Sequence, residues 1–381
     1  MGIGITEPLA FAAVCIWILG FALTYRELGI PLAMLVTTIK VGITLVYFSY
    51  LFTGDLLMKD DQVYHEYSVQ MFDRGWGPLR MITEPEGMKE VAILVGSGHF
   101  LYYWWNLLAF CIFGKFYYAP VFLNVGLTFA SAIVLAKLVR MAGFSRNYVR
   151  CFTVFFLLHW DLITWSSFVN LKDMIVLFLT ISSMYCIARL GQKLSLRYIM
   201  LLGFIFFLFS MLRFYLPVLI LMGGAAWVVY ELEDKRVLIL LPIILITLVA
   251  IAPDAGEEMG LYLQPTLSPY PAIRFFLMPQ FWTLQPDESF LLVSSLFHWA
   301  LFAPLLYGAV SLWKKSKITR LFLIYSMITI GFYSMVPELQ GYRHRMQLTF
   351  IIALCQFQAL WTFFHAGAPL KDPSTPAGAV S

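Results

Sequence analysis

The sequence has few charged residues. Only 13% of the 381 residues are Asp, Glu, Lys or Arg, whereas a soluble domain has about 25%. Hydrophobic residues make up 60% of the chain, and the mean hydropathy is +0.78. Water is a poor solvent for a surface of that composition. The composition therefore excludes an ordinary soluble domain and indicates a protein embedded in a bilayer.

The sequence also lacks paired cysteines and a secretory leader. Its cysteines all lie in apolar stretches without metal-type spacing, at Cys15, Cys111, Cys151, Cys186 and Cys355. We predict that they are small buried hydrophobic residues, and their spacing does not support a metal site. The N-terminus has no basic region of the kind that opens a signal peptide. The net charge of +4 comes from short basic clusters between apolar runs, so no nucleic-acid partner is expected.

Long apolar runs dominate what is present. A membrane span needs about 20 mostly apolar residues, and a helix satisfies its own backbone hydrogen bonds in lipid. The runs lack the alternation of an outer-membrane barrel. The sequence therefore predicts an all-α polytopic membrane protein with about eleven spans. They are expected near 8–24, 31–53, 117–138, 148–166, 172–190, 197–214, 216–231, 236–252, 290–312, 318–337 and 346–365.

The domain organisation is predicted to be simple. There is no internal repeat and no boundary of a soluble domain, so residues 1–365 form one membrane domain. Residues 366–381 are rich in Pro, Gly and Ala and are expected to be a disordered cytoplasmic tail. The run 99–114 is aromatic but short, and we expect it to lie at the membrane interface. A twelfth span at 99–114 is the alternative.

The basic residues predict the sidedness. With 99–114 at the interface, most of them fall on one side, which the positive-inside rule makes the cytoplasm. These residues are Arg26, Lys137, Arg140, Arg146, Arg150, Arg189, Lys193, Arg197, Lys235, Arg236, Lys314, Lys315, Lys317, Arg320 and Lys371. The chain is then expected in the plasma (inner) membrane, with its N-terminus outside and its C-terminus cytoplasmic. The main extracytoplasmic segments are the loops 54–116 and 253–289, with shorter ones at 166–172, 214–216 and 338–345.

One short stretch concentrates ionisable groups. It runs from Gly54 to Tyr67 and contains Asp55, Lys59, Asp60, Asp61, His65 and Glu66. The basic residues Lys172, Arg213, Arg343 and Arg345 lie at or near the same predicted face, against the positive-inside rule. The acids Asp161 and Asp173 lie there too. Ionisable groups at membrane depth are costly and usually mark function. Cations that face carboxylates at this surface suit a lipid phosphate carrying a group to be transferred.

The chemistry of such a site follows from the residue types. Arginine forks match phosphate oxygens bidentately and stay charged, so they would hold the donor and stabilise the leaving phosphate. A carboxylate would deprotonate an acceptor hydroxyl. Neighbouring carboxylates such as Asp60 and Asp61 raise each other's proton affinity, which favours a base.

Each of these groups also has a purely structural interpretation. The acids would be solvated loop charges or helix ends, and a helix end is the interpretation we favour for Asp55. His99 would be a hydrogen-bonded interface histidine. Lys172 and Asp173 would pair at a helix N-terminus, and the late arginines would snorkel to the interface.

Several motifs follow one another in a suggestive order. They are Asp60–His65, Gly98–Trp105, Phe113–Gly114, Leu123–Gly126, Trp165–Asp173, Phe276–Trp282 and Gly341–Arg345. Over about 50–360 this order resembles the C-type superfamily of integral-membrane glycosyltransferases, which includes relatives of protein O-mannosyltransferase and aminoarabinose transferase. The chain departs from that pattern in three ways. It has two predicted spans before the acidic loop where the superfamily usually has one, it has no Asp-X-Asp motif for a metal, and it has no soluble C-terminal domain.

The resemblance implies a function in the cell envelope. A sugar would pass from a polyprenyl-phosphate donor to a growing glycan, a glycolipid or a surface polymer, by inverting displacement and without a cofactor. Asp61 or Asp60 would be the general base. The resemblance and the charge pattern together point to substrate binding by Tyr64, His65, His99, Lys172, Asp173, Arg213, Tyr215, Arg343 and Arg345. The alternatives are a polysaccharide polymerase or ligase that uses polyprenyl-diphosphate glycans, and a flippase or transporter of lipid-linked glycans, which the missing repeat disfavours.

Overall fold

The protein is helical wherever its structure is described. The computed structural model describes residues 4–54, 56–95, 99–232, 270–336 and 341–365. Within these residues there are helices and turns but no strand. The prediction of an all-α chain is therefore confirmed for this part. The span predicted near 236–252, the first half of the loop 253–289, Asp55 and the tail 366–381 lie outside the described residues.

The described residues contain the following helices. In chain order they are α1 (Glu7–Leu28), α2 (Ile30–Val46), η1 (Tyr47–Leu51), α3 (Lys59–Asp73), α4 (Pro78–Thr83), α5 (Pro85–Val95), α6 (Phe100–Phe113), α7 (Tyr118–Met141), α8 (Arg146–Leu157), α9 (Trp160–Ser167), α10 (Asp173–Gln192), α11 (Leu196–Ser210), α12 (Leu216–Leu232), α15 (Tyr270–Leu277), η3 (Pro286–Leu291), α16 (Leu292–Ala300), α17 (Phe302–Lys315), α18 (Lys317–Met335), η5 (Tyr342–Leu348) and α19 (Thr349–His365). Gly29 alone separates α1 from α2, and its φ of +79° lets the chain turn directly from one helix into the next.

Within the described residues, six helices are long and apolar enough to cross a membrane. They are Glu7–Leu28, Ile30–Leu51, Tyr118–Met141, Asp173–Gln192, Lys317–Met335 and Tyr342–His365. Each has at least 18 residues, and a helix rises about 1.5 Å per residue, so each approaches the thickness of the hydrocarbon core. These helices correspond to six of the predicted spans. Membrane insertion is thus supported by their length and composition.

The predicted number of eleven spans is not confirmed. The run 290–312 is a pair of helices bent by 53°, so a seventh span exists if this pair crosses as one. The run 148–166 is broken between α8 and α9. The runs 197–214 and 216–231 are the shorter helices α11 and α12, of 15 and 17 residues. Hydropathy did not reveal these breaks because it is averaged over a window, in which a single polar residue such as His159 or Arg213 is outweighed by its apolar neighbours.

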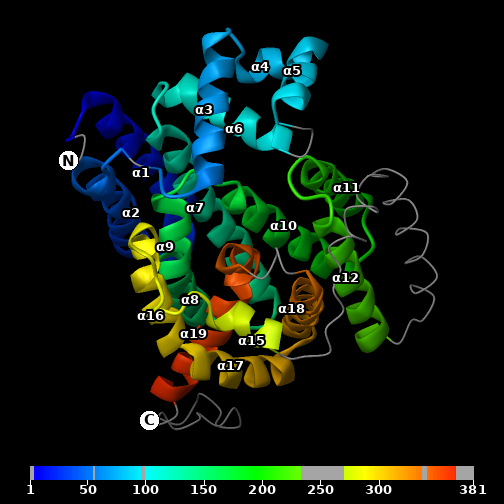
Figure 1. Ribbon diagram of the computed structural model, residues 1–381. Coiled ribbons are helices and arrows are strands. Elements are labelled where there is room, and N and C mark those ends of the chain that lie inside the picture. Colours follow the sequence, from blue (N-terminus) through cyan, green and yellow to red (C-terminus); the bar gives the residue numbers. More distant parts are fainter. Residues whose placement is uncertain (1–3, 55, 96–98, 233–269, 337–340, 366–381) are drawn as a thin grey trace, which may run out of the picture.

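The acidic stretch contains the start of α3, a helix at one end of the bundle. Figure 1 shows α3, α4, α5 and α6 together at one end of the molecule, which we call the cap, and α17 at the opposite end. Asp60 and Asp61 occupy the first turn of α3, where carboxylates complement the helix dipole. The predicted interfacial run 99–114 is α6, whose 14 residues are fewer than a span requires. The acidic stretch therefore lies where the cap meets the end of the bundle.

The cysteines are less uniformly buried than predicted. Cys186 and Cys355 are buried and Cys15 is half-buried, but Cys111 and Cys151 are exposed. The prediction of burial was therefore wrong for these two. Both lie on apolar helices, α6 and α8, and a thiol behaves as a small hydrophobic group in contact with lipid as it does in a core.

The packing of α17 on α19 depends on Gly308. A Cβ atom added at Gly308 would lie 1.7 Å from the carbonyl oxygen of Cys355, so the two backbones are in direct contact there. We expect Gly308→Ala to separate the helices and lower the unfolding free energy by about 1–3 kcal/mol or more. Thermal unfolding in detergent measures this effect. Gly331→Ala in α18 is the matched control, because its added methyl group meets no atom within 4 Å. Equal melting temperatures for the two variants would contradict the prediction.

Candidate functional site

Charged side chains from four distant segments meet where the cap joins the bundle. Arg343 in η5 donates from Nε to Asp173 Oδ2 at 2.8 Å and from Nη1 to Asp60 Oδ2. Arg213 donates from Nη2 to the other oxygen of Asp173, at 2.6 Å. Lys172 adjoins Asp173 in the chain and is also buried. We call Asp60, Lys172, Asp173, Arg213 and Arg343 the charge cluster.

Local structure explains where each member of the charge cluster lies. Asp60 is in the first turn of α3 and Asp173 is the first residue of α10, so both carboxylates sit at helix N-termini, where they are favoured. Arg213 lies in the turn between α11 and α12. The structure thus brings together the acid of the first loop and the distant basic residues that the charge pattern singled out.

The charge cluster is buried on one side and open on the other. Lys172 and Arg213 are each 6% exposed and Asp173 is 1% exposed. The Asp60 side chain, in contrast, is 54% exposed. Burial acts to raise the pKa of Asp60, but the charge and hydrogen bond of Arg343 outweigh it and hold that pKa below its usual value. Asp60 is therefore an ionised carboxylate at the accessible edge of a buried, cation-rich site.

Lys172 is an unusual member because it lies against a histidine. Its Nζ is 2.5 Å from His99 Nδ1 and donates to the carbonyl of Leu212 at 3.2 Å. Burial, together with Arg213 and Arg343, brings the pKa of Lys172 well below its usual value. Burial and the nearby Lys172 lower the pKa of His99 to about 4, so this imidazole is neutral at neutral pH and accepts the hydrogen bond. His99 thus borders the charge cluster as a neutral hydrogen-bond partner of Lys172.

Of the predicted aromatic and histidine residues, Tyr64 and Tyr215 lie near the charge cluster and His65 faces away from it. Tyr64 is buried, and its Oη is 3.5 Å from His99 Nδ1. Burial acts to lower the pKa of Arg213, but Tyr215 and Asp173 outweigh it and raise that pKa above its usual value. Tyr215 Oη also accepts a hydrogen bond from Tyr333 at 3.5 Å. His65 packs instead edge-on against Phe110 and Tyr117, toward α6.

Arg345 lies outside the charge cluster. It is 2% exposed, and it contacts Asp161 Oδ1 at 3.4 Å and the carbonyl oxygens of Phe276, at 3.2 Å, and Met278. Ser294 donates to Asp161, and His298 Nδ1 lies 4.0 Å from its other oxygen. We call this second group the inner cluster. The expectation that Arg345 binds the same ligand as Arg343 does not match this position.

The inner cluster fixes the chain just before the second predicted extracytoplasmic loop ends. Four consecutive carbonyls accept hydrogen bonds from side chains. Arg345 donates to Phe276 and Met278, Trp299 donates to Leu277 at 3.0 Å, and Ser295 donates to Pro279. We call residues 276–279 the held segment. The segment comprises the last two residues of α15 and the two that follow it, where carbonyls have no partner within a helix and are satisfied by these side chains instead.

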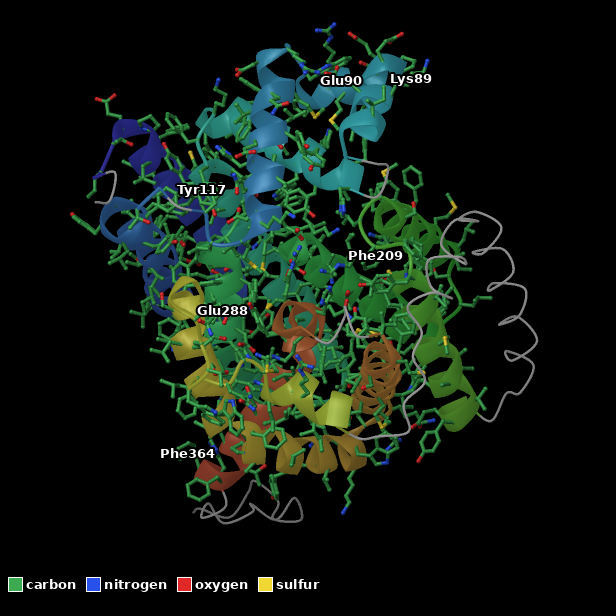
Figure 2. All side chains as sticks on the ribbon, viewed as in Figure 1. Lys89, Glu90, Tyr117, Phe209, Glu288 and Phe364 are labelled. Atoms are coloured by element: carbon green, nitrogen blue, oxygen red, sulfur yellow. The ribbon has the colours of Figure 1, made fainter. Side chains whose placement is uncertain are left out.

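Sequence reasoning missed the surroundings of Asp61. This carboxylate is fully buried. Its Oδ1 accepts from the backbone N–H of Asn170 at 3.0 Å, and its Oδ2 accepts from Tyr117 Oη. Figure 2 shows Tyr117 beside the lower half of α3, near the junction of cap and bundle. The available signal was the presence of asparagines within apolar helices, since a buried amide is costly unless it is hydrogen-bonded.

No metal-binding group was found in the part of the chain that the structure describes: no three His, Cys, Asp or Glu side chains come together as ligands. What the charge cluster offers instead is the guanidinium groups of Arg213 and Arg343, which bind anions, with Lys172 beside them. Such a cluster next to a half-exposed carboxylate can hold an anionic leaving group beside a base.

Fold and site together define a polytopic all-helical membrane protein with a buried cluster of cations and carboxylates at one end of its bundle. Comparisons with known protein families, with characterised proteins and with solved structures find no match to this chain. Its function must therefore be argued from the site.

Proposed function

We propose that the chain is a membrane glycosyltransferase that moves a sugar from a polyprenyl-phosphate donor to a glycan, glycolipid or surface-polymer acceptor. The resemblance to the C-type superfamily motivates this class. The observation that carries the proposal is the position of Arg343 between Asp60 and Asp173, with Arg213 and Lys172 beside it. In this proposal the cap faces the extracytoplasmic side, with the N-terminus outside and the C-terminus in the cytoplasm.

The cations of the charge cluster would bind the phosphate. Arg213 Nη1 is buried and has no hydrogen-bond partner within the described residues, so it has an N–H to offer a ligand. A buried unpaired donor is costly, which a phosphate oxygen would relieve. Arg343 is the natural second contact, because a guanidinium fork binds a phosphate bidentately. Both groups would then stabilise the charge that develops on the leaving phosphate.

Asp60 is the carboxylate that an acceptor can reach. Its carboxylate would take the proton of the acceptor hydroxyl while that oxygen attacks the anomeric carbon. The bond from that carbon to the phosphate oxygen breaks, and the electron pair leaves with the polyprenyl phosphate, so the configuration inverts. Arg343 is now paired with Asp60. A phosphate that draws Arg343 away would raise the proton affinity of Asp60, so the base would become effective only when the donor is bound.

A reconstituted assay tests the proposal. Purified protein in liposomes is mixed with synthetic polyprenyl-phosphate hexoses and pentoses and with soluble glycan acceptors. We expect acceptor-dependent release of polyprenyl phosphate and a new glycosidic bond, measured by mass spectrometry. Donor counterflow without any covalent product would instead support a transporter. Use of polyprenyl-diphosphate glycans alone would support a polymerase or ligase.

A further inference from the structure

The two adjacent aspartates of α3 lie in different surroundings. The Asp60 side chain is 54% exposed and faces Arg343, whereas Asp61 is fully buried. Both oxygens of Asp61 are occupied, by the N–H of Asn170 and by the hydroxyl of Tyr117. A general base must come within about 2.6–3.2 Å of the hydroxyl that it deprotonates. Asp61 meets protein donors at that range, so it is poorly placed for that role.

The partners of Asp61 belong to a larger buried network. The side chain of Asn170 accepts from Tyr102 Oη at 2.6 Å and donates to Asn106 Oδ1 at 2.8 Å. Asn124 donates to the carbonyl of Leu171 at 3.2 Å. A polar network whose members are hydrogen-bonded in a dry core is rigid and specifies one arrangement. These bonds tie α6 and α7 to the turn 168–172.

That turn leads directly into the charge cluster. Lys172 ends it, and Asp173 begins α10. Tyr117, besides binding Asp61, lies 3.5 Å from the carbonyl of Phe168 at the start of the turn. The hydrogen bonds between Asp61 and the turn therefore hold the first turn of α3 next to the N-terminus of α10. The first of these carries Asp60, and the second carries Lys172 and Asp173.

We infer that Asp61 is a positioning residue, which holds Asp60 at its place opposite the Lys172–Asp173 end of α10 through the buried hydrogen bonds to Asn170 and Tyr117. This inference rests on the proposed function for its catalytic consequence, but its structural content does not. It assigns different tasks to two carboxylates that the sequence presents as equivalent.

Replacement by the isosteric amide separates positioning from base catalysis. In Asp61→Asn the amide oxygen can still accept from the Asn170 N–H. The amide nitrogen can donate to Tyr117 Oη if the tyrosine hydroxyl turns to the Phe168 carbonyl, which is already 3.5 Å away. We expect this variant to keep its turnover within about threefold of the wild type. Asp61→Ala removes both hydrogen bonds between α3 and its neighbours and leaves the Asn170 N–H without its acceptor, so the helices can shift. A displacement of about 1 Å can cost on the order of 10²-fold in rate.

The pH dependence of stability gives a readout that does not need enzymatic activity. Burial raises the pKa of Asp61 to about 7, although the bonds from Tyr117 and Asn170 oppose the shift. A carboxyl in the unfolded chain titrates near its ordinary value of about 4. The folded state therefore binds this proton more tightly, and its contribution to stability is lost as the pH rises through about 7. Asp61→Asn cannot lose a proton. The difference between its melting temperature and that of the wild type should therefore shift in favour of the variant as the pH rises from about 4 to about 7.

The outcomes distinguish the inference from the proposed function. A folded Asp61→Asn protein that binds donor but has lost transfer would make Asp61 the base and overturn the inference. Parallel melting curves of the wild type and Asp61→Asn across this pH range would also overturn it. If the wild type itself transfers no sugar, the proposed function fails. The melting curves alone then decide whether Asp61 is a positioning residue. The inference is supported by retained transfer in Asp61→Asn, loss in Asp61→Ala, and a melting-temperature difference between Asp61→Asn and the wild type that changes from about pH 4 to pH 7 and is constant above that.

Discussion

Replacement of Asp60 by asparagine is expected to lower the rate of sugar transfer by about 10²–10⁴-fold, which is the usual contribution of a general base. Asparagine has the same shape, so α3 should remain folded and the donor should still bind. It cannot accept the proton of the acceptor hydroxyl, so the loss should appear in kcat with little change in KM for the donor. Single-turnover kinetics of the reconstituted protein measures the chemical step directly.

The same helix provides a matched control. Asp73 lies at the other end of α3, its side chain is 55% exposed against 54% for Asp60, and it is paired with Lys115 at 2.6 Å. Asp73→Asn removes the same charge from the same helix at the same exposure but far from the charge cluster. We expect wild-type turnover from it. If both variants lose transfer equally, the effect belongs to the net charge of the cap and Asp60 is not the base.

Replacement of Arg343 by glutamine is expected to weaken donor binding and to slow transfer by about 10²–10³-fold, because a preorganised donor to the leaving group is lost. It also leaves Asp60 without its partner and Asp173 with Arg213 alone. Arg343→Lys keeps a charge but not the fork, so it should restore only part of the loss. Binding of a polyprenyl-phosphate sugar to the purified protein, measured beside turnover, separates affinity from chemistry.

Arg320 offers the comparison for Arg343. It is partly buried in α18 and forms an ion pair with Glu231, so Arg320→Gln breaks a similar arginine–carboxylate contact elsewhere in the bundle. We expect its donor affinity to equal that of the wild type. A comparable loss of affinity in Arg320→Gln would mean that the phosphate site is not at Arg343.

The sequence indicated which segments meet but not which side chain of each does so. Asp60 and Asp61 are neighbours in one helical turn, about 100° apart around the helix axis, and only the packing of Asn170 and Tyr117 decides which of them is buried. Arg343 and Arg345 belong to a 3₁₀ helix, which has about three residues per turn. Residues two apart in such a helix face different sides, so one arginine reaches the charge cluster and the other the inner cluster.

Helix lengths were predictable only where the apolar run was long and uninterrupted. The spans at α1, α2, α7 and α10 agree with the sequence because each is a continuous apolar stretch. The breaks at 158–159 and 301 were not visible, because hydropathy averages over a window and carries no information on direction. Buried polar contacts such as His159 with Gln356, at 2.9 Å, form only once the broken helices have packed.

The held segment has a consequence for the affinity of the donor. Arg345 attaches η5 to the carbonyls of Phe276 and Met278 and to Asp161 of α9 on one side, and Arg343 attaches it to α3 and α10 on the other. The backbone around Arg343 therefore has little freedom to move. A ligand that binds there pays little entropy for ordering the protein. A binding site that is preorganised in this way would bind a polyprenyl phosphate tightly even when that lipid is scarce in the bilayer.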